Sequence, residues 1–110
     1  MSDVSGVGGQ QPQYSPEEIQ KYRDDYQKSY DLFEKAFHDY NQPGVEEHKK
    51  AQLQKVMGEA LQVMNETACV ALKKGKIEDE KQLSNDYSNF LQNPTPENQK
   101  KVSDDLETLK

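Results

Sequence analysis

With 20 acidic against 14 basic side chains, this 110-residue chain carries a net charge of −6, which repels phosphate backbones and anionic membrane surfaces. We therefore expect neither nucleic acid nor lipid as a direct partner. Only 20 residues are Leu, Ile, Val or Phe. This number is close to the level below which chains bury too little apolar surface to offset the entropy of ordering. The core must therefore use aromatic side chains or be completed by a partner.

Residues 1–14 combine Gly, Ser, Gln and Pro without periodicity, so we predict that they form a disordered tail. The remainder, residues 15–110, is predicted to be a single helical-bundle domain, since a chain of this length does not supply a second core. Its first helix should begin after Ser15, a capping residue that is followed by Pro16 at the first helical position and by Glu18, which can close a capping box.

Six of the nine aromatic side chains recur along this first helix at spacings of three and four residues, which places them on one face. We call this face the aromatic stripe; it consists of Tyr22, Tyr26, Tyr30, Phe33, Phe37 and Tyr40. The helix should end near Asn41, where Pro43 and Gly44 form a turn.

A second helix is predicted from about Val45 to Lys74, with a wider apolar sector than the first. Gly58 lies inside it, and because glycine there costs about 1 kcal/mol relative to alanine, we expect a neighbouring helix to approach closely at that point. Gly75 is expected to end the helix in the left-handed conformation.

A third helix is predicted from about Glu78 to Gln92, and its apolar side chains lie on one side. The sequence NPTP then stops it, and a fourth helix should begin at Pro96, after Thr95. Together these elements predict an all-α fold, an antiparallel helical bundle of three to four helices behind the N-terminal tail.

The aromatic stripe has three interpretations. As core, it suits a small bundle that is short of leucine, because tyrosine buries a large ring and keeps its hydroxyl at the solvent edge. As a docking face, it suits a helix whose other faces are charged, because tyrosine is enriched at interfaces. A phosphotyrosine or stacking site is the third interpretation, since acidic residues precede Tyr26.

No catalytic or cofactor motif is present in the sequence, so we expect a protein that is not an enzyme and that needs no cofactor. His38 and His48 are the only histidines, and Cys69 alone does not complete a zinc ligand set, so no metal site is predicted. Cys69 follows Ala68 on the second helix and is expected to be a buried structural thiol.

Adjacent acidic residues occur at several places, among them Asp104 and Asp105. Neighbouring residues on a helix point roughly 100° apart and do not converge on one substrate, so we interpret these pairs as solvated faces rather than as general acids and bases.

The sequence thus predicts a non-enzymatic protein-interaction module: an adaptor, a chaperone or an assembly subunit that binds through the aromatic stripe. Its partner would be another protein or a second copy of itself, so a homo-oligomer is one expected state. No apolar run approaches the roughly 20 residues of a transmembrane helix, no secretory signal is seen, and Cys69 has no partner for a disulfide; we therefore expect a soluble, cytoplasmic protein.

The alternative function is an exported substrate or a structural component of a bacterial secretion system, exported without a cleaved signal peptide. The Ser/Gly/Gln-rich residues before the first helix resemble the unfolded leaders of type III secreted proteins. The arrangement of helix, NPTP and helix is similar to the proline-broken hairpin of needle subunits.

Overall fold

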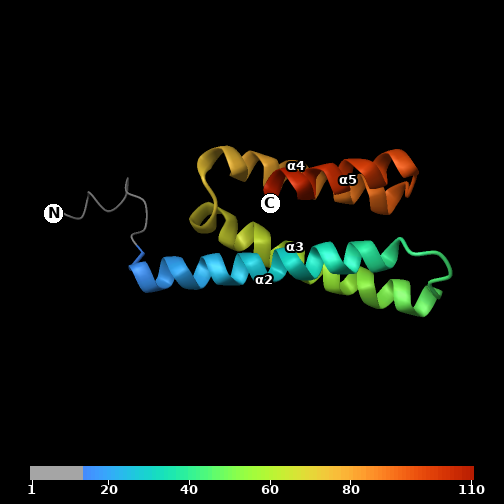
Figure 1. The fold of residues 1–110 in the computed structure, drawn as a ribbon, viewed down its shortest axis with the longest axis horizontal. Coiled ribbons are helices and arrows are strands. Elements are labelled where there is room, and N and C mark those ends of the chain that lie inside the picture. The colour runs from blue at the N-terminus through green and yellow to red at the C-terminus, as the bar shows by residue number, and fades with distance from the viewer. Residues whose placement is uncertain (1–13) are drawn as a thin grey trace.

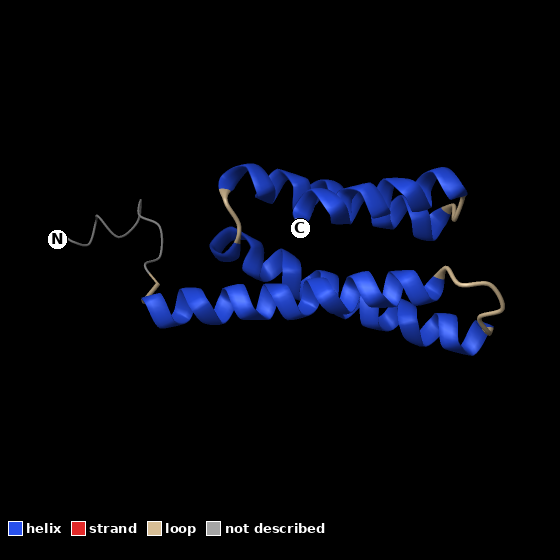
Figure 2. Ribbon diagram, viewed as in Figure 1, coloured by secondary structure: helices blue, strands red, loops and turns tan. Residues whose placement is uncertain are grey.

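The computed structural model describes residues 14–110, which form four α-helices and no strand (Figures 1 and 2). The helices are α2 (Pro16–Tyr40), α3 (Glu47–Ala71), α4 (Lys74–Gln92) and α5 (Pro96–Leu109). The predicted all-α bundle is therefore confirmed. The predicted tail lies outside the described residues, apart from Tyr14.

Helix α2 begins as its sequence predicts, with a complete capping box. The backbone N–H of Glu18 donates to Ser15 Oγ at 3.1 Å, and the backbone N–H of Ser15 donates to Glu18 Oε1 at 2.9 Å. Two backbone donors that the helix cannot satisfy internally are thereby paired. At the other end, Asn41 Nδ2 donates to the carbonyl of Phe37 at 2.8 Å, and Gly44 turns the chain with a φ of +79°.

The boundary between α3 and α4 differs from the prediction. Helix α3 ends at Ala71, and the extended residues Leu72 and Lys73 connect it directly to α4, which begins at Lys74. Gly75 therefore lies in the first turn of α4 with a helical backbone, and the predicted left-handed cap is wrong. The extended Leu72 and Lys73 already reverse the chain, so no left-handed residue is needed.

The four helices form two antiparallel hairpins, α2–α3 and α4–α5, and the second lies along one side of the first (Figure 1). The α4–α5 turn is held by the backbone N–H of Asn98, which donates to Thr95 Oγ1 at 3.2 Å, and by Asn98 Nδ2, which donates to the carbonyl of Asn93 at 2.8 Å. Helix α2 contacts all three other helices: it packs against α3, its rings meet those of α4, and Tyr30 reaches α5.

One hydrophobic cluster runs through all four helices. Its side chains of lowest exposure come from every helix: Phe33, Met57, Met64, Leu83, Phe90 and Val102. Phenylalanine and methionine occupy the places where leucine would be common, in keeping with the few aliphatic residues of the chain.

Gly58 does not mark a close helix contact, so that prediction is wrong. It lies on the exposed side of α3, and a Cβ added to it would meet no atom within 4 Å. The buried sector of α3 lies on the other side, where Met57 and Leu61 pack into the core.

Replacing Gly58 with alanine should therefore stabilise the fold. Gly58→Ala removes the entropic penalty of a helical glycine and should raise the free energy of unfolding by about 1 kcal/mol, or the melting temperature by about 4–8 °C. Thermal melts followed by circular dichroism measure this. Gly44→Ala is the matched control and should destabilise, because the φ of Gly44 is positive; a fall in stability for Gly58→Ala would contradict the open environment of that site.

Candidate functional site

The structure divides the aromatic stripe into a buried centre and two accessible ends. Its central members, Tyr26, Tyr30, Phe33 and Phe37, are at most 5% exposed. Tyr22 at one end and Tyr40 at the other are half-buried. The centre of the stripe is therefore core. Binding through the stripe stays a prediction, and in the closed fold only Tyr22 and Tyr40 are accessible for it.

The centre of the stripe packs edge-to-face against two rings of α4. The Phe33 ring lies 5.0 Å from that of Tyr87 with an interplanar angle of 74°, and the Phe37 ring lies 5.2 Å from that of Phe90 at 64°. This geometry places the positive edge of one ring against the negative face of the other. The two hairpins are thus joined by aromatic contacts from α2 to α4.

The tyrosine hydroxyls of the core are unequally satisfied. Tyr30 donates its hydroxyl hydrogen to the backbone carbonyl of Leu106 on α5. The hydroxyls of Tyr26 and Tyr87 are buried without a hydrogen-bond partner among the protein atoms. Burial, reinforced by the negative charge of Glu80, raises the pKa of Tyr26, and burial likewise raises the pKa of Tyr87 to about 12. These phenols stay neutral at physiological pH, so they act as packing groups rather than as acids.

Each accessible end of the stripe has a neighbour that holds its ring. Tyr22 packs edge-on against Tyr14, with ring centroids 5.4 Å apart and an interplanar angle of 84°. The ammonium group of Lys50 lies 5.6 Å from the centroid of Tyr40, a cation–π contact. The first turns of α2, next to Tyr22, project beyond the α4–α5 hairpin (Figure 1). An aromatic pair, with Tyr14 37% exposed, therefore lies near the projecting end of α2.

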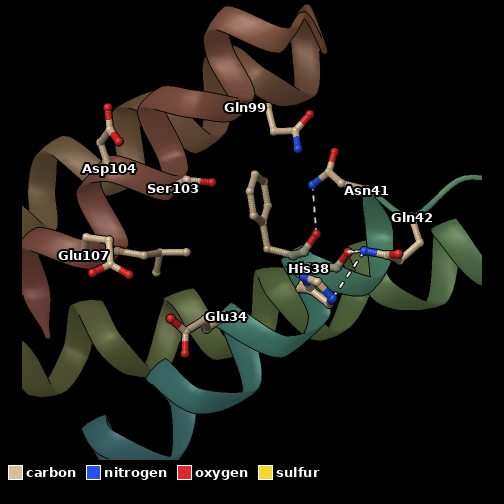
Figure 3. Close-up of a pocket in the computed structure, with 10 residues that line it drawn as sticks. Glu34, His38, Asn41, Gln42, Gln99, Ser103, Asp104 and Glu107 are labelled. Atoms are coloured by element: carbon tan, nitrogen blue, oxygen red, sulfur yellow. Dashed lines mark hydrogen bonds between the residues drawn. The ribbon is translucent and has the colours of Figure 1, made fainter.

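A groove of about 290 Å³ lies between the C-terminal half of α2 and α5 (Figure 3). Phe37 and Leu106 line it, and three carboxylates, those of Glu34, Asp104 and Glu107, line it as well. Lysines already pair with all three: Asp104 with Lys100 at 2.8 Å, and Glu107 and Glu34 with Lys110 at 3.2 Å and 3.7 Å. The groove is therefore lined by apolar side chains at Phe37 and Leu106 and by carboxylates that are already paired with lysines. The sequence pattern does not indicate this groove.

The histidines and the cysteine do not come together. Within residues 14–110, no group of three or more His, Cys, Asp or Glu side chains is arranged to hold a metal ion. His38 lies beside the α2–α5 groove, where its backbone carbonyl accepts from Gln42 Nε2 at 3.2 Å. Cys69 is exposed beside a recess between α3 and α4, so the prediction of a buried thiol is wrong; the neighbouring Ala68 takes the buried position instead.

Two further acids lie in the helix contacts. Glu80 on α4 is only 3% exposed, and the side chains of Asn65 on α3 and Ser84 on α4 surround it. With its amide nitrogen turned toward Glu80, Asn65 donates to Glu80 Oε1 at 2.9 Å. Asp105 is not part of a solvated face, because its Oδ2 is buried; that prediction is wrong for this residue. The sequence does contain a signal for this burial: Asp105 lies three residues after Val102 and four before Leu109, so it shares the buried face of α5 with them.

Comparisons with known proteins give no relative: no family model, no curated protein and no solved structure matches this chain. Within the described residues, no helix is both long and apolar enough to cross a membrane. The class that the fold defines is thus an all-α bundle of two helical hairpins.

Truncation of the stripe at its centre should strongly destabilise the bundle. Phe33 is fully buried, so Phe33→Ala should cost about 3–5 kcal/mol, out of a total of about 5–15 kcal/mol for a domain of this size. The loss should appear as a lower melting temperature by circular dichroism. The adjacent Leu32 is 53% exposed, and Leu32→Ala should change stability by less than about 0.5 kcal/mol. Equal effects from the two variants would contradict the buried position of Phe33.

Glu80 should make the fold less stable as the pH rises. Burial raises the pKa of Glu80 above its ordinary value of 4.5, so the folded state holds its proton more tightly than the unfolded chain does. Stability contributed by the protonated form is therefore complete at low pH and is lost as the pH rises through the folded pKa. Glu80→Gln should melt higher than the parent chain at pH 8, on the order of 1 kcal/mol in stability, and lose that advantage at pH 4.

The matched control for Glu80 is Glu78, whose side chain is 77% exposed on the same helix. Glu78→Gln should leave the dependence of the melting temperature on pH unchanged. An equal gain for both variants would show that net charge, rather than burial of Glu80, governs the effect.

Proposed function

We propose that this protein is a non-enzymatic protein-interaction module that binds through the accessible ends of the aromatic stripe. The observation that supports the proposal is the division of the stripe: its centre is used as core, while Tyr22 and Tyr40 remain half-buried on a helix whose start projects from the bundle. Aromatic side chains that combine an apolar ring with a polar tip are favoured at protein interfaces.

The Tyr22 end is the stronger candidate. Tyr14, which is 37% exposed, stands edge-on to Tyr22, so the pair presents apolar ring surface together with two hydroxyl groups. Acidic and basic residues surround it, among them Lys21, which pairs with Asp25 at 2.9 Å. An aromatic centre within a charged rim matches the common anatomy of protein interfaces. The partner is another protein or a second copy of the chain, and the role is that of an adaptor, chaperone or assembly subunit.

Light scattering after size exclusion over a concentration series tests self-association. If the partner is a second copy, the mass should fall on dilution, and Tyr22→Ser should shift the protein toward monomer while the melting temperature stays within a few degrees of the parent. If the parent is a monomer at every concentration, affinity capture with the parent chain and with Tyr22→Ser identifies proteins whose recovery depends on Tyr22.

The control for both measurements is Leu32→Ser, because Leu32 is the most exposed large apolar side chain within residues 14–110 and lies off the stripe. A partner or an oligomer that is lost with Leu32→Ser and kept with Tyr22→Ser would place the interface elsewhere on α2. Retention by both variants and by Tyr40→Ser would reject the stripe as the binding surface.

The alternative, an exported substrate or structural component of a bacterial secretion system, is favoured by one observation. Helices α4 and α5 form an antiparallel hairpin that is broken at Asn93–Thr95, the arrangement that resembles needle subunits. Fusion of residues 1–20 to a reporter tests this function: export of the reporter would support it, and retention in the cell would exclude a leader in this segment.

A further inference from the structure

Two carboxyl groups from different helices meet between α4 and α5. Asp86 on α4 is 7% exposed, and its Oδ1 accepts from Gln82 Nε2 at 3.1 Å. The side chain of Asp105 on α5 lies close enough to that of Asp86 for a hydrogen bond when one of the two carries a proton. The Oδ2 atom of Asp105 is buried and has no hydrogen-bond partner among the protein atoms. A buried carboxylate oxygen without a donor is costly, whereas a carboxylic acid in the same place could donate to the opposing carboxylate.

The surroundings of this pair supply negative charge and no paired cation. The negative charges of Asp79 on α4 and Asp104 on α5 both act on Asp105, and Lys100, one turn before Asp104, is bound to Asp104 at 2.8 Å. Lys101, one turn before Asp105, is exposed and forms no ion pair with it. Asp105 is thus surrounded by acids on both helices of its hairpin.

The other helices do not neutralise the pair either. On α2, Tyr30 donates to the carbonyl of Leu106, and Glu34 is held by Lys110. On α3, Asn65 faces α4 and is engaged with Glu80 and Ser84. On α4, Lys76 reaches α5, but its ammonium group donates to the backbone carbonyl of Thr108. Within residues 14–110, neither Asp86 nor Asp105 forms an ion pair with a basic side chain.

We propose that Asp86 and Asp105 form a proton-operated latch, which holds α5 against α4 while the two carboxyl groups share one proton and loosens α5 when that proton is lost. The shared proton forms a hydrogen bond from a carboxylic acid to a carboxylate, a short and strong type of contact. Its loss leaves two carboxylates facing each other across the helix contact. The latch acts on the fold itself and does not rest on the proposed binding function.

The pKa of Asp105 agrees with this geometry. The pKa of Asp105 is raised from an ordinary value of 3.8 to about 7. Burial is the largest cause, followed by the hydrogen bond to Asp86 and the nearby negative charges. Because the folded state then binds a proton that the unfolded chain has released, the free energy of unfolding falls as the pH rises between these two values. The protein should be more stable at mildly acidic pH than above neutrality.

Loosening of α5 would expose apolar side chains that the bundle buries. Val102, Leu106 and Leu109 are its buried side chains, and Leu106 supplies the carbonyl that accepts from Tyr30. Release of α5 would therefore expose this part of the aromatic stripe, and Tyr30 would exchange a protein acceptor for water.

A carboxyl ¹³C NMR titration of the full parent chain tests the latch directly. The Asp105 signal should titrate between about pH 6 and 8, whereas exposed aspartates titrate near pH 4. In thermal melts, the parent should lose at least about 4 °C between pH 5.5 and pH 8.5. Asp105→Asn, which keeps a hydrogen-bond donor and carries no charge, should melt higher than the parent at pH 8.5 and show a smaller loss over this range.

Three controls make the result decisive. Asp86→Asn should reproduce the behaviour of Asp105→Asn from the opposite helix, and Asp104→Asn, which alters an exposed neighbour, should keep most of the pH dependence of the parent. The slope that Asp105→Asn retains should become smaller when Glu80→Gln is added, because burial of Glu80 acts in the same direction. Titration of Asp105 below pH 5, or an unchanged slope in both Asp105→Asn and Asp86→Asn, would overturn the proposal.

Discussion

The fold depends on the edge-to-face contacts between the rings of α2 and α4. A chain with so few aliphatic residues cannot fill the space between four helices with leucine, and aromatic side chains bury more surface per residue. Phe33 and Phe37 supply one side of this contact, and Tyr87 and Phe90 supply the other.

The use of tyrosine in the core brings polar atoms into the same layer. A tyrosine hydroxyl that reaches a backbone carbonyl, as that of Tyr30 does, fixes the register of two helices. Those of Tyr26 and Tyr87 lack such a protein partner, and the carboxyl groups of Glu80 and Asp86 are buried nearby on α4. The contact between the hairpins therefore contains polar groups as well as apolar area, and its strength depends on the protonation of Glu80.

Much of this architecture could be predicted from the sequence because helix signals are local. The capping box at Ser15, the aromatic spacing on α2 and the break at NPTP each act within a few residues, and the structure has each of them. The burial of the stripe's centre also follows from its period. Its partition into centre and ends did not, since it depends on how far the α4–α5 hairpin covers α2. At one end the Tyr40 ring still packs against Phe90 of α4, with centroids 5.9 Å apart, whereas the first turns of α2 extend past the hairpin (Figure 1).

The errors arose where a residue's role depends on packing rather than on its neighbours in sequence. The chemistry of glycine predicts a close contact at Gly58 and a cap at Gly75, but both residues lie in helices, and a Cβ added to either would meet no atom within 4 Å. Cys69 is exposed although a buried thiol is predicted, and Asp105 is partly buried although a solvated carboxylate is predicted. A shift of one residue around a helix decides which side chain faces the neighbouring helix. Such rotations are set by tertiary contacts.

The two-residue connection between α3 and α4 has a consequence for how the chain folds. Each hairpin is built from contacts that are local in sequence, whereas the hydrogen bond from Tyr30 to Leu106 joins residues 76 positions apart. Loop-closure entropy disfavours such distant contacts until the intervening chain is ordered. Because Leu72 and Lys73 join the two hairpins directly, formation of each hairpin shortens that effective separation, and we expect the contact between Tyr30 and Leu106 to form when the hairpins dock.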